Sequence, residues 1–201
     1  MNSNYLNEYS SLLERILSVA ANKQYSNRMV EREIAYSSFF QNIEREKDGH
    51  ASIIDDVSLV NQIFNDSTLD LDAIPFYNEC AWAAESYIRI QEETRLTFEA
   101  IFLYIPIEKM YGYFPIFHEM DFSQIVDEFK RLFSLRSTLD LLAERFNFSL
   151  KHISKETGIS YDTLFSYKQR RRDIKKMNAD SAYVLASILR ARIETLLEIK
   201  V

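Results

Sequence analysis

The chain has 201 residues, of which 47% are hydrophobic and 27% charged, as in a globular protein with one sizeable core or a core plus a small module. Gly and Pro occur only three times each. A sheet-rich fold needs many tight turns, which draw on these residues, so the composition favours an all-α fold. The single cysteine excludes an intrachain disulfide and a cysteine-based zinc site. No apolar run is long enough for a secretory signal or a membrane span, so we expect a cytoplasmic protein with no membrane partner.

Charge is distributed unevenly along the chain. Residues 137–201 hold 12 Lys and Arg against 8 Asp and Glu, a net charge of +4. Subtraction from the totals of 24 and 30 leaves 12 against 22 for residues 1–136, a net charge of −10. This asymmetry predicts two modules with different partners, an acidic one over residues 1–136 and a basic one over residues 137–201.

In the acidic module, apolar residues recur at helical spacing. Thr97 is expected to cap a helix that Pro106 ends, and the segment up to residue 120 is expected to be broken helix around Gly112 and Pro115. Gly49 is expected to close the second helix, and Pro75 to lie in the first turn of the fourth. The helices predicted for this helical bundle cover residues 5–20, 29–43, 53–64, 75–91, 97–105 and 122–133.

The basic module is predicted to hold four short helices and a last turn or helix. Their apolar positions include Leu139, Leu142, Ala143 and Phe146 in the first, and Ile193, Leu196 and Leu197 in the last. Residues suited to cap the second, third and fourth helices are Ser149, Ser160, and Asn178 or Asp180.

The second and third of these helices have the spacing of a helix-turn-helix. Gly158 supplies the left-handed position of the turn, and Ser154 is small enough for a close helix crossing. Ile159 is expected to fill the corner, while Leu164 and Tyr167 point into the core.

The residues SLKHISKETGISYDTLFSYKQRRR (149–172) resemble the lambda-repressor-like helix-turn-helix of Cro, phage repressors and XRE-type regulators. This resemblance, from about residue 138 to 197, implies a five-helix DNA-binding module with its recognition helix at 161–169. Two departures are Phe165, where a small or polar residue commonly faces DNA, and Arg190-Ala191, which replaces a Gly-containing break and predicts continuous fourth and fifth helices. By the resemblance, the residues that face DNA bases are Tyr161, Asp162, Phe165, Ser166 and Gln169.

A basic run follows the recognition helix, where DNA phosphates would lie. Such a run can also be a solvated face, but together with the turn it favours DNA binding. The predicted phosphate contacts are Lys168, Arg170, Arg171, Arg172, Lys175 and Lys176.

We therefore expect a sequence-specific transcriptional regulator that binds double-stranded DNA as a homodimer. Residues 79–110 and 114–125 are also similar to parts of bacterial antitoxin-like regulators, which makes an antitoxin or phage-related repressor the expected role. The acidic module would then dimerise the protein or hold a toxin or other protein partner. The alternative is a protein-binding inhibitor that uses the helix-turn-helix as a scaffold.

The sequence predicts no catalytic, metal or cofactor site, and hence no enzyme; a small hydrolytic enzyme is a distant third hypothesis. His118, Glu119 and Asp121 lack the His pair of a zinc helix, and a helix-end cap explains them better. No Gly-rich loop could cradle a phosphate. Residues 98–122 contain a band of aromatic side chains. We interpret it first as part of the core and second as a groove for a partner or a dimer interface. Its members are Phe98, Phe102, Tyr104, Tyr111, Tyr113, Phe114, Phe117 and Phe122.

Overall fold

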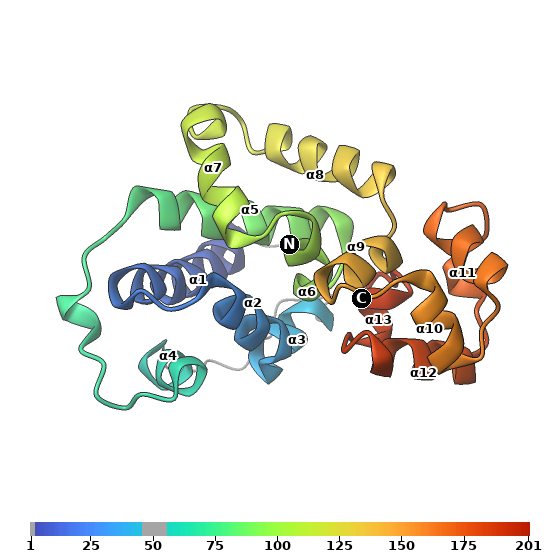
Figure 1. Ribbon diagram of the computed structural model, residues 1–201. Coiled ribbons are helices and arrows are strands. Elements are labelled where there is room, and N and C mark those ends of the chain that lie inside the picture. The colour runs from blue at the N-terminus through green and yellow to red at the C-terminus, as the bar shows by residue number, and fades with distance from the viewer. Residues whose placement is uncertain (1–2, 46–55) are drawn as a thin grey trace.

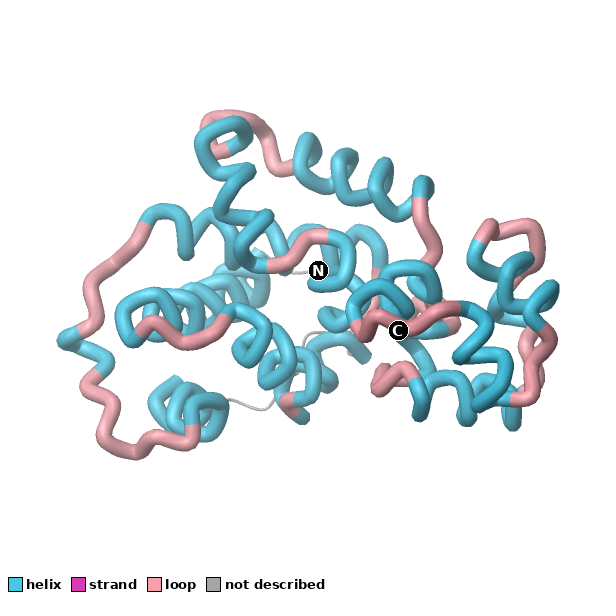
Figure 2. Tube along the Cα trace, viewed as in Figure 1, coloured by secondary structure: helices cyan, strands magenta, loops and turns pink. Residues whose placement is uncertain are grey.

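The computed structural model describes residues 3–45 and 56–201, and within these ranges the protein is all-helical, as predicted (Figures 1 and 2). Gly49 and the start of the predicted 53–64 helix lie outside the described residues. The helices are α1 (Ser3–Lys23), α2 (Asn27–Tyr36), α3 (Ser38–Arg45), α4 (Asp56–Phe64), α5 (Asn78–Thr94), α6 (Phe98–Tyr104), α7 (Ile107–Phe117), α8 (Ser123–Leu135), α9 (Thr138–Arg145), α10 (Leu150–Thr157), α11 (Tyr161–Lys168), α12 (Ala179–Ile188) and α13 (Ile193–Leu196), with 3-10 turns η1 (Leu71–Ala73) and η2 (Ile174–Lys176).

Helices α5 and α6 lie at the centre of the first eight helices, and α4 packs on α1 and α2. Helix α1 lies along α5, α2 packs against α6, and α7 and α8 both contact α5. Large side chains that are fully buried at these contacts include Phe40, Tyr87, Phe98, Phe102 and Phe129. Figure 1 shows α4 and the α10–α12 group at opposite ends of the molecule, with α7 and α8 along one edge. No helix among residues 3–45 and 56–201 is long and apolar enough to cross a bilayer.

Three predictions about this region are wrong. The expected helix over residues 29–43 is two helices, because Ser37 has extended backbone between α2 and α3. Pro75 precedes α5, whose N-cap is Tyr77. Helix α7 runs through Gly112 and Pro115 without a break. Pro115 lies in its last turn, so the missing N–H removes one hydrogen bond just before the helix ends at Phe117.

Helices α12 and α13 are separate, contrary to the prediction of one continuous helix. Arg190 takes the left-handed conformation, with φ of 49°, that a glycine would normally supply. The N–H of Ala191 then bonds the carbonyl of Ala186 at 3.0 Å, the 6→1 bond that closes a helix end. Among the described residues the same left-handed position recurs without glycine at Gln24, Asn65, Arg95, Asn147, Arg170 and Glu198. Seven helices of this glycine-poor chain therefore end at a non-glycine residue in the left-handed conformation, which is unfavourable for most side chains.

Replacement of Gln24 by Gly should therefore stabilise the protein by roughly 0.5–1 kcal/mol, because Gln24 is exposed and has φ of 56°. Urea unfolding would measure the change. Ala21→Gly, at an exposed position within α1, is the matched control and should destabilise by roughly 0.5–1 kcal/mol. A loss of stability in Gln24→Gly would show that its backbone is not strained.

Residues 1–136 and 137–201 share one continuous core. Helix α6 contacts both α9 and α13, and α9 also contacts α11 and α13. Leu139, Leu142, Leu185 and Leu196 belong to the same buried cluster as the apolar residues of α1, α5 and α6. The two predicted modules therefore do not have separate interiors.

Candidate nucleic-acid interface

The turn between α10 and α11 has the predicted geometry. Gly158 ends α10 with φ of 72°, and its N–H bonds the carbonyl of Ser154 at 3.0 Å. The Ser154 hydroxyl donates to the carbonyl of Ile159 at 2.7 Å, which ties the second half of the turn to α10. Gly158 is required for its backbone conformation, since a Cβ there would meet no atom within 4 Å.

The predicted caps of these helices are confirmed. The side-chain oxygens of Ser149, Ser160 and Asn178 accept hydrogen bonds from the first-turn N–H groups of α10, α11 and α12. Leu164 and Tyr167 are buried, as predicted, where α11 packs against α9 and α10. The inner face of α11 is thereby fixed, and its opposite face is left towards solvent.

The residues predicted to face DNA bases all lie on the outward side of α11. Asp162 and Gln169 are exposed, Tyr161 is 43% exposed, and Phe165 and Ser166 are half-buried. The rings of Tyr161 and Phe165 stack with centroids 6.1 Å apart and planes at 14°. The surface of α11 thus combines a flat aromatic pair with polar groups.

Four of the six predicted phosphate-contacting residues are exposed and form no ion pair with the described residues; they are Arg171, Arg172, Lys175 and Lys176. The guanidinium carbon of Arg171 lies 5.8 Å from the centroid of the Phe165 ring, and that of Arg172 lies 5.5 Å from Tyr167. Lys175 and Lys176 are on η2, which the buried Ile174 anchors. The segment directly after α11 thus presents four cations that have no ion-pair partner among the described residues.

Lys168 and Arg170 have other partners, and for Arg170 the predicted phosphate contact requires a correction. The ammonium of Lys168 pairs with Asp140 at 2.8 Å. The guanidinium of Arg170 binds both carboxylate oxygens of Glu198, at 2.7 and 2.9 Å, and the carbonyls of Phe133 and Arg136, each at 2.9 Å. Since its donors are used within the chain, Arg170 connects α11 to α8 and α13 and is not free to bind phosphate.

Four buried glutamates join helices that lie far apart in the sequence. Each accepts a backbone N–H bond at the start of a helix far away in sequence. Glu31 binds Ile107 N at 2.9 Å, Glu44 binds Phe98 N at 2.7 Å, Glu99 binds Arg192 N at 3.0 Å, and Glu198 binds Thr138 N at 3.1 Å. These N–H groups have no partner within their own helix, and the helix dipole favours a negative charge there.

Arginines from residues 137–201 pair with three of these carboxylates. Arg145 lies 3.4 Å from Glu31, Arg192 lies 2.7 Å from Glu44, and Arg170 lies 2.7 Å from Glu198. Glu44 is fully buried and the side chain of Arg192 is 8% exposed, so this pair lies almost entirely out of water. Burial raises the pKa of Glu31 and of Glu44, although the neighbouring arginines oppose the rise.

Sequence reasoning missed this network. The sequence gives one sign of such a network, which is a charged residue within an apolar helical pattern. Glu44 follows Phe39-Phe40, and Glu99 lies between Phe98 and Ala100. The partners could not be found from the pattern, since they lie 54 to 93 residues away along the chain.

The other candidate sites have structural roles. His118 caps the end of α7, with its Nδ1 atom 2.8 Å from the carbonyl of Phe114, and Asp121 accepts the N–H of Ser123 at the start of α8. Within residues 3–45 and 56–201, no cluster of His, Cys, Asp or Glu could hold a metal ion. In the aromatic band, Phe98, Phe102 and Tyr104 are core residues; Tyr111, Tyr113, Phe114, Phe117 and Phe122 are half-buried around α7.

No protein-family model matches the chain, and no curated protein or solved structure shows a significant similarity to it.

Arg192→Met should destabilise the protein by about 3–5 kcal/mol, because it leaves Glu44 buried without its cation. A carboxyl whose pKa is raised by folding binds more protons when folded, so stability is lost as pH rises through that pKa. The loss in free energy of unfolding, measured by urea unfolding against the unmodified chain, should thus be larger at pH 8 than at pH 5.

The matched control is Arg45→Met, which breaks a surface pair of 3.8 Å with Glu194 and should cost at most about 1 kcal/mol at either pH. Equal losses in the two variants would contradict a special role for the buried pair.

Proposed function

We propose that the protein is a sequence-specific DNA-binding regulator in which α10 and α11 are a lambda-repressor-like helix-turn-helix. The observation that carries the proposal is the outward face of α11, followed at once by four cations that form no ion pair with the described residues. In this arrangement α11 enters the major groove, and the loop that follows it lies against the phosphate backbone.

In this proposal the buried arginines and glutamates contribute to DNA binding indirectly. Arg170 fixes the end of α11 against α8 and α13, while Lys168 ties it to α9 through Asp140. Base readout needs side chains held in a defined register, so a rigid support for α11 favours specificity. The acidic remainder of the chain repels DNA and confines the duplex to the basic face.

We further propose that residues 1–136 supply a protein contact, as a homodimer interface or as the binding surface for a toxin. This rests on large apolar side chains that are open to solvent around α7 and α8: Ile116 is 58% exposed, Met120 50% and Leu135 66%. A contiguous exposed apolar surface marks sites where proteins associate, and Ile116 and Met120 lie close together at the end of α7 and in the turn after it. The same surface would serve the alternative function, a protein-binding inhibitor, and DNA binding separates the two.

Replacement of Arg171 and Arg172 together by Gln should weaken binding to every duplex alike. Each phosphate contact releases condensed counterions, so the slope of log affinity against log salt should become shallower by about 0.9 per lost contact and protomer. A salt titration on one operator and one scrambled duplex measures it. The control is Lys23→Gln with Lys130→Gln, which removes two charges from α1 and α8 and should leave the slope unchanged. An unchanged slope in the arginine variant would exclude these residues from a DNA interface.

Gln169→Ala should relax base preference at one position of the operator, at ~1–3 kcal/mol of discrimination, and should leave the salt slope unchanged. Binding to a set of operators with single base-pair changes would measure the preference. A uniform loss over all sequences would place Gln169 on the backbone instead.

A further inference from the structure

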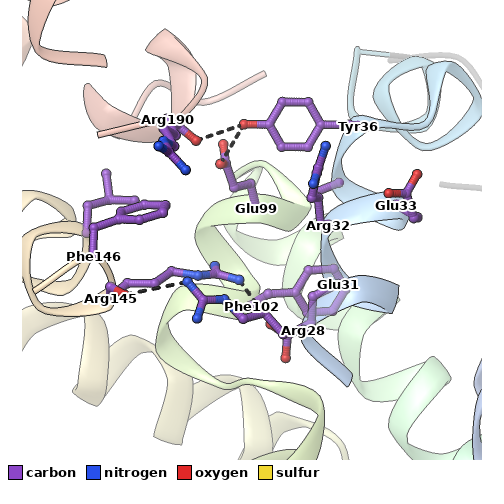
Figure 3. A pocket seen from close by; sticks show the side chains of 12 residues that line it. Arg28, Glu31, Arg32, Glu33, Tyr36, Glu99, Phe102, Arg145, Phe146 and Arg190 are labelled. Atoms are coloured by element: carbon purple, nitrogen blue, oxygen red, sulfur yellow. Dashed lines mark hydrogen bonds and ion pairs between the residues drawn. The ribbon is translucent and has the colours of Figure 1, made fainter. Parts of the chain in front are cut away.

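A cleft of about 600 Å³ separates α2 and α6 from the ends of α9 and α12 (Figure 3). This volume is within the range of about 300–1,000 Å³ that is usual for pockets of small molecules. Its walls hold the guanidinium groups of Arg28, Arg32, Arg145 and Arg190. An adjoining cleft of about 670 Å³ shares Arg28 and Arg145 with it, so the space is not closed at that side.

The four arginines differ in their partners. Arg145 pairs with Glu31, but Arg28, Arg32 and Arg190 form no ion pair with any of the described residues. Arg28 reaches the carbonyl of Arg145 at 3.5 Å, which is a long and uncharged contact. Four arginines thus line the cleft against three carboxylates, Glu31, Glu33 and Glu99, which leaves an excess of positive charge.

Two of the three carboxylates around the cleft are engaged elsewhere. Glu31 is held by Arg145 and by the N–H of Ile107. Glu99 accepts from the Tyr36 hydroxyl at 3.0 Å and from the Arg192 N–H at 3.0 Å. Glu33 is half-buried and also lines the cleft.

Phe146 gives the cleft a flat apolar wall between two of the free cations. Its ring centroid lies 5.9 Å from the guanidinium carbon of Arg28 and 6.0 Å from that of Arg190. Guanidinium groups bind phosphate and carboxylate through paired, parallel hydrogen bonds, and an aromatic ring stacks on flat ligands. The two features together match a molecule with both an anionic group and a ring.

We propose that this cleft binds a small organic anion in which an aromatic ring bears a phosphate or carboxylate group. The guanidinium groups that form no ion pair hold the anion, and the ring stacks on the guanidinium planes beside Phe146. Arg28 and Arg32 lie on α2, whereas Phe146 and Arg190 follow α9 and α12, so an occupant contacts both halves of the chain. This site does not depend on DNA binding by α11.

Isothermal titration calorimetry on the full chain tests the site with two anions, AMP and indole-3-acetate, and their neutral counterparts adenosine and indole. At least one anion should bind with one-to-one stoichiometry and roughly tenfold tighter than its neutral counterpart. The choice between AMP and indole-3-acetate distinguishes phosphate from carboxylate ligands.

The double variant Arg28→Gln with Arg190→Gln should lose roughly tenfold or more in affinity. Arg32→Gln, whose side chain contacts none of the described residues through a hydrogen bond or ion pair, gives a second reading if the double variant does not fold. Lys23→Gln with Lys130→Gln removes the same charge at a distance, from α1 and α8, and should bind as the unmodified chain does. The proposal is overturned if neither anion binds at about 5 mM, if the neutral compounds bind equally well, or if the control variant loses as much affinity as the cleft variants.

Discussion

Four glutamate side chains are buried between the two halves of this chain, and each must be satisfied there. A buried carboxylate without partners costs several kcal/mol, so its donors have to be in place in the folded state. Here the donors are the free N–H groups that begin α6, α7, α9 and α13, and three of the four carboxylates add an arginine. The positions of these helices are consequently coupled, and a shift of one leaves a charge unpaired in the interior.

This coupling also fixes the position of α11 and of the cations that follow it. The cations at the end of α11 fall into two groups. Lys168 and Arg170 form ion pairs within the chain, whereas Arg171, Arg172, Lys175 and Lys176 are exposed to solvent. A buried ion pair adds little net stability over an apolar contact, but it is intolerant of misplacement. We therefore attribute to Arg170 and Arg192 an orienting role, which the proposed DNA-binding surface requires.

Local features of the fold were predictable from the sequence, and long-range ones were not. The caps Thr97, Ser149 and Ser160 and the turn at Gly158 are encoded within four or five residues, and all were predicted correctly. The break at Arg190 was missed because any residue can be forced into a left-handed conformation when the next helix must pack elsewhere. The glutamates were missed for a related reason, since a carboxylate in an apolar pattern reveals burial but not its partner. The charge division at residue 136 was read correctly from composition, yet the core runs through it.

Native-state hydrogen exchange tests the coupling most directly. The amides of Phe98, Thr138 and Arg192 donate to Glu44, Glu198 and Glu99, and they lie at the start of α6, at the start of α9 and just before α13. If the halves form one unit, these three amides exchange with the same opening free energy, equal to that of global unfolding, and with the same dependence on denaturant. The contrary result is that the protected amides of α9 to α13 have an opening free energy several kcal/mol lower than the amides of α5 and α6. The C-terminal helices would then unfold on their own, and the glutamates would not hold the two halves together.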